Sequence, residues 1–210
     1  AKTVTITSSY TGADVSNYSI TNQTSTTADI SAKALTPTAS ASNKTYDATN
    51  SASVTLTLSG LVGSETLGST NTSTFNNKNV GTGKTVTVNS ITLADGSGLA
   101  ANYSISAGQT TTADITAKAL TVSGITASNK TYDGSTNVTL TGTAVYSGLV
   151  SGDTFDGTYT GVFSDKNVGT GKTVNITSSY SGADVNNYSV TDQSSTTANI
   201  TAKSLTVSGI

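Results

Sequence analysis

Apolar side chains alternate with threonine, serine and asparagine in short runs along the chain. In KTVNIT, Val174 and Ile176 fall on one face of an extended segment, and the polar residues between them fall on the other. KTVTV at 84–88 and KTVTI at 2–6 repeat this pattern. A period of two residues is typical of a strand that buries one of its faces. The pattern therefore predicts strands over these segments.

Two further runs extend the alternation. VTLTL places three apolar side chains on one face, and NVTLTGTAVY aligns four: Val54, Leu56 and Leu58 in the first, and Val138, Leu140, Ala144 and Tyr146 in the second. Gly, Asn, Asp and Ser interrupt the runs at short intervals, and no stretch keeps a helical period. Only SGLVSGDTF and SGADVNNY have room for a single helical turn. The fold class predicted is all-β, with at most a little helix.

The same motifs return in the same order about every 85 residues. NKTYD stands at 43–47 and 129–133, KNVGTGKTV at 78–86 and 166–174, and NYS at 17–19, 102–104 and 187–189. This spacing divides the chain into the second half of one copy (1–35), two full copies (36–120 and 121–206) and the start of another (207–210). Both ends interrupt the pattern, which predicts a piece of a longer array.

The length of the repeat indicates small tandem domains. A period near 85 residues is too long for one coil of a solenoid, but it suits a small β-domain. An immunoglobulin-like sandwich and a β-grasp-like sheet both fit the strand pattern. In ITAKALTVSGI (115–125) no Gly/Ser-rich linker separates the copies, so we expect a continuous strand and a stiff connection. Each copy scales to about 30 Å across, and tandem copies would form an elongated rod.

Composition mainly excludes functions. Charged residues make up 10% of the chain, the net charge is −2, and all ten cations are lysine. Nucleic acid is not an expected partner, because its binders neutralise phosphates with clustered Lys and Arg. Since Cys and His are absent, we expect no disulfide, no thiolate or imidazole catalysis, and no metal or cofactor. No apolar run is long enough to span a bilayer, so we expect no membrane insertion by this segment. We also expect it to be a monomer without enzyme activity.

The hexapeptide VGTGKT occurs twice, at 80–85 and 168–173. A phosphate-binding P-loop needs G-x-x-x-x-G-K-[ST] followed by a helix. Lys78 and Lys166 stand where the first glycine belongs, and an alternating strand follows each motif. We therefore interpret KNVGTGK as a tight turn between two strands, with glycines that supply positive φ.

The remaining polar motifs have structural interpretations. TYDG at 131–134 predicts an Asp-Gly turn beside a tyrosine that anchors the edge of the core. The acidic residues are interpreted as solvated turn residues, because they lack the spacing of a calcium loop and of a repeated catalytic pair: Glu65, Asp153, Asp156 and Asp165. Lys118 and Lys203, with Asn102 and Asn187, leave an isopeptide crosslink open, and several N-x-[ST] triplets leave glycosylation open.

One difference between the copies bears on ligand binding. GTYTGVF (157–163) has Tyr159 where STNTSTF (69–75) has Asn71. An exposed tyrosine is a platform on which a sugar can stack, although it is also ordinary strand surface. Tyr159 is therefore the candidate ligand-binding residue.

The ordered series ITAKxLT, NKTYDG, SGLVSGDTF, KNVGTGKTV, NYSV and TTANIT resembles the YDG/MBG-type repeats of large bacterial surface proteins. These include filamentous-haemagglutinin-like adhesins, which are exported across an outer membrane. The resemblance covers residues 1–210, with Ala48 in place of the glycine of the motif. It implies a secreted, cell-surface stalk that projects a binding region from the cell, with neighbouring repeats of the same chain as partners. The alternative is an adhesive module with weak repeated sites for host or biofilm glycans or matrix.

Overall fold

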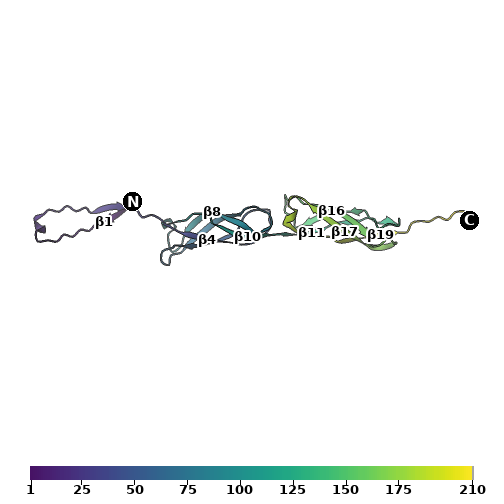
Figure 1. The fold of residues 1–210 in the computed structure, drawn as a ribbon, viewed down its shortest axis with the longest axis horizontal. Helices are drawn as coiled ribbons and strands as arrows, with labels where there is room; N and C mark the ends of the chain where they lie inside the picture. The colour runs from purple at the N-terminus through teal and green to yellow at the C-terminus, as the bar shows by residue number, and fades with distance from the viewer. Residues whose placement is uncertain (210) are drawn as a thin grey trace.

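The structure, a computed structural model, describes residues 1–209. It places an N-terminal hairpin and two β-domains one after another along a single long axis (Figure 1). Almost all regular structure in this part is β, so the all-β prediction is confirmed. Its helices are three single 3-10 turns: η1 (Val15–Asn17), η2 (Ala100–Asn102) and η3 (Val185–Asn187). The helical turn expected in SGADVNNY is therefore present as η3, whereas SGLVSGDTF forms turns.

The first repeat contains a four-stranded sheet in the order β5-β10-β8-β7 and two short pairs, β4-β6 and β3-β9. Its strands are β3 (Lys33–Ala34), β4 (Thr36–Ala41), β5 (Lys44–Thr45), β6 (Val54–Ser59), β7 (Leu67–Phe75), β8 (Gly81–Asp95), β9 (Tyr103–Ser104) and β10 (Thr110–Thr116). The long strands β7, β8 and β10 are antiparallel, and β5 adds to β10 in parallel.

The second repeat has the same plan. Its four-stranded sheet runs β13-β19-β17-β16, and β15-β11-β18 with β12-β14 form the second layer. The strands are β11 (Lys118–Ser123), β12 (Thr126–Ala127), β13 (Lys130–Thr131), β14 (Leu140–Thr141), β15 (Val145–Ser147), β16 (Asp156–Phe163), β17 (Gly169–Ser181), β18 (Tyr188–Thr191) and β19 (Ser195–Thr201). Side chains from both layers meet in the core. Each repeat is therefore a small β-domain of more than one sheet, and no helix exceeds one turn within residues 1–209.

The core follows the predicted alternation. In β8, Val86 and Val88 are 0% exposed, while the threonines between and before them face away from the core. Val174 of β17 is also fully buried, whereas Ile176 two residues on is half-buried. The run NVTLTGTAVY is bent at Gly142, and this divides it between β14 and β15.

The N-terminal hairpin pairs β1 (Lys2–Thr5) with β2 (Ser25–Ala28). The predicted strand is present, but its apolar face is not buried, because no second sheet among residues 1–209 lies over it. Ile30 is 82% exposed, whereas its counterpart Ile200 in the second repeat is 1% exposed. Alternation therefore produces a strand here without producing a core.

A single residue, Ala117, separates the last strand of the first repeat from the first strand of the second. The sequence places the boundary between residues 120 and 121, a position inside β11. All pairing of β11 is with the second repeat, in parallel with β18 and antiparallel with β15. The two domains thus follow one another without a flexible linker.

The glycine motif lies in a hairpin, as interpreted from the sequence. Residues 76–80 connect the antiparallel strands β7 and β8, and no helix follows. Gly83 and Gly171 have φ of 58° and 57°, but they lie inside β8 and β17, where the register with β10 and β19 shifts. Their positive φ therefore serves a bulge in the strand and not the turn itself.

Candidate functional site: the junction between the repeats

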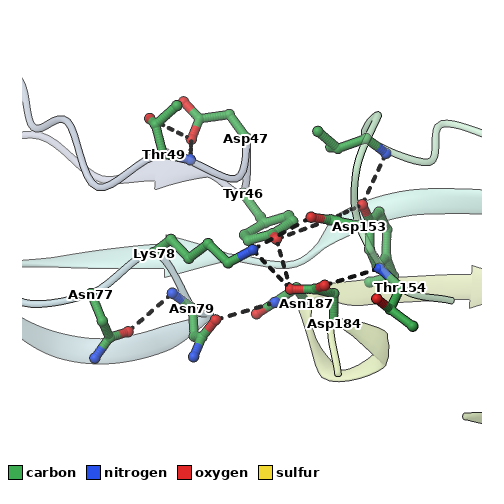
Figure 2. Close-up of polar contacts among 12 residues, drawn as sticks. Tyr46, Asp47, Thr49, Asn77, Lys78, Asn79, Asp153, Thr154, Asp184 and Asn187 are labelled. Atoms are coloured by element: carbon green, nitrogen blue, oxygen red, sulfur yellow. Dashed lines mark hydrogen bonds and ion pairs between the residues drawn. The ribbon is translucent and has the colours of Figure 1, made fainter. Parts of the chain in front are cut away.

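Two turns project from the end of the first repeat towards the second. The first follows β5 and carries Tyr46; Asp47 accepts a hydrogen bond from the Thr49 amide at 2.9 Å, which closes an Asx turn. The Lys44 ammonium lies 2.7 Å from the same Asp47 carboxylate. The second turn follows β7 and carries Lys78 (Figure 2). In the second turn the Asn79 amide donates to the Asn77 side chain at 3.0 Å. Each turn that faces the second repeat is therefore closed by a local side-chain bond.

Two carboxylates face these turns from the second repeat. Asp153 lies in the turn after β15, and Asp184 immediately precedes η3. The Thr154 amide donates to Asp184 at 3.0 Å, and the Tyr188 hydroxyl donates to Asp153 at 2.6 Å while accepting from the Val150 amide at 2.9 Å. Bonds within the second repeat therefore hold both carboxylates in place.

Lys78 and Tyr46 bridge the two carboxylates, and these four residues form the junction network (Figure 2). The Lys78 ammonium lies 2.9 Å from Asp184 and 3.5 Å from Asp153. The Tyr46 hydroxyl lies 2.9 Å from Asp153 and 3.3 Å from Asp184. The Asp153 side chain is only 2% exposed. A buried carboxylate requires such partners, because an unpaired charge inside a protein is costly.

The charges of the junction network stabilise one another. The Lys78 ammonium is the main cause that lowers the pKa of Asp184 below its usual value, with help from the Thr154 amide. In turn Asp184 and then Tyr46 raise the pKa of Lys78. Burial, followed by the bond to Asp153, raises the pKa of the Tyr188 hydroxyl to about 12. Burial also raises the pKa of the Tyr46 hydroxyl. At neutral pH Lys78 is therefore an ammonium, Asp184 is a carboxylate, and the Tyr46 and Tyr188 hydroxyls are protonated.

Neutral contacts complete the junction. The Val80 amide donates to the Asn187 side-chain oxygen at 3.0 Å, and the Asn187 amide group donates to Asn79 at 3.4 Å. The rings of Tyr46 and Tyr188 meet edge to face with centroids 5.6 Å apart. Such aromatic pairs and charge-assisted bonds favour one relative placement of the two repeats.

One interpretation of the acidic residues is wrong. Asp153 is not a solvated turn residue, since its side chain is 2% exposed and lies in the junction network. Asp165 is exposed, but it pairs with the Lys172 ammonium at 2.6 Å. Glu65, the counterpart of Asp153, accepts a hydrogen bond from Tyr103. An acidic residue at this position in both copies was the sequence signal for a shared role.

Tyr159, the predicted ligand-binding residue, lies in β16 and is half-buried. Its hydroxyl donates to the Tyr146 hydroxyl at 3.1 Å, and its ring lies 6.3 Å from that of Tyr180. Burial and the Tyr146 bond raise its pKa. It therefore belongs to an aromatic cluster and is not the freely exposed platform assumed from the sequence; a ligand role for it stays a prediction.

The other candidates are also placed by the structure. Asn187 is 3% exposed and bonded to Asn79 and Val80; no hydrogen bond joins it to Lys118 in the described part of the chain. Among residues 1–209, no group of three His, Cys, Asp or Glu side chains is arranged to hold a metal ion. The same residues include no helix with the length and apolar character needed to cross a membrane.

The fold and the junction define a class of protein: tandem all-β repeats joined end to end through their turns. The YDG domain matches this chain twice, over residues 31–113 and 116–198. The chain belongs to the YDG domain family. No curated protein and no solved structure matches it.

Proposed function

We propose that this chain is part of the stalk of a bacterial cell-surface adhesin, in which YDG repeats act as spacers that project a binding region from the cell. The observation that carries the proposal is the junction. Two repeats are joined by one residue, a buried carboxylate pair and a lysine. A spacer needs length and resistance to bending, and such a connection supplies both.

Bending is opposed by the chemistry of the junction network. Tilting one repeat away from the other separates Lys78 from Asp184 and removes the Tyr46 hydroxyl from Asp153. It also leaves Asp153 with fewer partners for a charge that is 2% exposed. The penalty for an underpartnered buried charge favours the extended arrangement seen in Figure 1.

A distance measurement between the repeats tests the spacer role. The chain has no cysteine, so Thr92→Cys and Thr177→Cys introduce two sites for spin labels, one on the exposed face of each long strand. We expect a narrow distance distribution from pulsed electron paramagnetic resonance. Lys78→Met should broaden it, and Lys166→Met, the matched change at the far end of the second repeat, should not. A broad distribution in the unmodified chain would refute a stiff spacer.

The alternative function is an adhesive module for host or biofilm glycans, and one observation favours it. A hollow of about 370 Å³ lies beside Tyr159, lined also by Asn137, Val138, Leu140, Thr160 and Gly161. In the first repeat the counterpart Asn71 instead donates to the Val54 carbonyl at 2.9 Å. A hollow of about 500 Å³ also lies beside Asn71, so the tyrosine, and not the hollow, is what distinguishes the second repeat.

A screen against immobilised glycans and extracellular-matrix proteins separates the two functions. Saturable binding that is lost in Tyr159→Ala and kept in Asn71→Ala would establish the adhesive role. Absence of binding at high protein concentration would favour the spacer. Labelling of intact source cells with an antibody raised against this chain tests the proposed location at the cell surface.

A further inference from the structure

The end of the second repeat carries the same side chains that the first repeat uses at the junction. We name this set the C-terminal face: Tyr132, Lys166, Asn167 and Val168, the counterparts of Tyr46, Lys78, Asn79 and Val80. Tyr46 is 1% exposed in the junction, whereas Tyr132 is only partly buried. Val168 is 53% exposed, and no ion pair involves Lys166 within residues 1–209. The face therefore presents the junction chemistry without the cover that the first repeat has.

The segment that follows shows the same lack of cover. Residues 203–208 match β11 in sequence, with Leu205 and Val207 in the places of Leu120 and Val122. Leu120 and Val122 are 0% and 3% exposed, whereas Leu205 and Val207 are 89% and 73% exposed. β11 is buried because it lies between β15 and β18. Residues 203–208 thus have the side chains of a core strand and lack a sheet within the described chain.

We call the end of a repeat that carries Asp153, Asp184 and Asn187 in the second repeat its N-terminal face. We propose that the C-terminal face and residues 203–208 together form a docking surface for a further YDG repeat whose N-terminal face carries two carboxylates. The strand would complete that repeat's second layer, as β11 does. Lys166 would pair with the two carboxylates, and the Val168 amide would donate to an asparagine placed as Asn187 is. The inference rests on the proposed spacer role, because it extends the same junction along the chain.

The requirement for two carboxylates comes from a comparison of the two N-terminal faces. In the second repeat the residue before η3 is Asp184, and in the first repeat the residue before η2 is Leu99. Leu99 is 59% exposed and stands where Asp184 does. Glu65 takes the place of Asp153, and Asp95 accepts from the Ala100 amide at 2.7 Å. The Lys166 ammonium is complementary in charge to a face that carries two carboxylates, as Asp153 and Asp184 do in the second repeat. The docking surface therefore fits a repeat of the second type better than one of the first type.

A lengthened chain tests this directly. Residues 126–201 are repeated after Ile210, so that residues 202–210 occupy the place of 117–125 in the added copy. Hydrogen exchange at the Val168 amide is followed by NMR, with the Val80 amide of the same molecule as the reference. We expect Val168 to slow to the rate of Val80. Lys166→Met and, separately, Asp184→Leu in the added copy should each return Val168 towards its rate in the 210-residue chain.

Two results would overturn the proposal. One is a Val168 amide that exchanges as fast as in the 210-residue chain although the core amides of the added repeat are protected. The other is slowing of Val168 in the 210-residue chain as its concentration rises, which would identify a second copy as the occupant. If the Val168 amide exchanges fast while the Val80 amide stays protected, the docking proposal fails. The junction between the two repeats, on which the spacer proposal rests, is then unaffected.

Discussion

Replacing Tyr46 with phenylalanine removes one hydroxyl from the junction and keeps the ring. Tyr46 is 1% exposed, and its hydroxyl lies 2.9 Å from Asp153 and 3.3 Å from Asp184. A hydrogen bond to a charged group contributes about 1.5–3 kcal/mol. Asp153 keeps the Tyr188 hydroxyl at 2.6 Å, and Lys78 stays near both carboxylates. We therefore expect Tyr46→Phe to lower the free energy of unfolding by about 2 kcal/mol.

The chain contains its own control for this change. Tyr132 occupies the same motif position in the second repeat, and its hydroxyl makes no hydrogen bond to any residue that the structure describes. Tyr132→Phe should change the free energy of unfolding by no more than about 0.5 kcal/mol. Urea denaturation followed by circular dichroism measures both variants. Equal losses in the two variants would refute the assignment of the Tyr46 hydroxyl to the junction.

Three further predictions concern single residues. Ala48 has φ of 64° where Gly134 has 80°, so Ala48→Gly should raise, and Gly134→Ala lower, the free energy of unfolding by about 1 kcal/mol in thermal denaturation. The pKa of Asp184 is lowered from 3.8, mainly by Lys78. Its stabilisation is therefore complete above that pH and is lost as the pH falls through the folded pKa; Asp184→Asn should flatten this part of a stability–pH curve. Lys130→Met removes an ammonium that lies 2.8 Å from Asp133 and donates to two backbone carbonyls, and urea denaturation should show a loss of about 2 kcal/mol.

The strands were predictable because their signal is local. Val86 and Val88 alternate with threonine, and both are fully buried in β8. The Asp-Gly turn was predictable for the same reason, since the Asx turn of Asp133 depends only on the Ser135 amide two residues away. These features arise from the backbone geometry of neighbouring residues.

The junction was not predictable from such local patterns. Lys78 meets Asp153 across 75 positions in the chain, and Tyr46 meets Asp184 across 138. Nothing next to Asp153 in the sequence distinguishes it from a solvated turn residue such as Asp165. Its burial depends on where the preceding repeat places a turn. The tyrosine of TYDG was predicted to anchor the edge of the core; its counterpart Tyr46 is 1% exposed, but the Tyr46 hydroxyl bonds to the next repeat.

The junction uses the C-terminal end of one repeat and the N-terminal end of the next. A repeat that has a neighbour on each side therefore needs both sets of side chains, which explains why the motifs NKTYD, KNVGTGKTV and NYS recur together. A contact between two different faces is heterologous, and it can continue from unit to unit without closing. In separate molecules such a contact risks uncontrolled fibres, but in a covalent chain the number of units limits its length. If the proposed docking holds, each inner repeat would carry a lysine and a tyrosine at one end and their acceptors at the other. At the position of Asp184 the first repeat has Leu99 and still forms the same sheets, so the fold does not depend on this acceptor, and the proposed docking assigns it to the choice of neighbour.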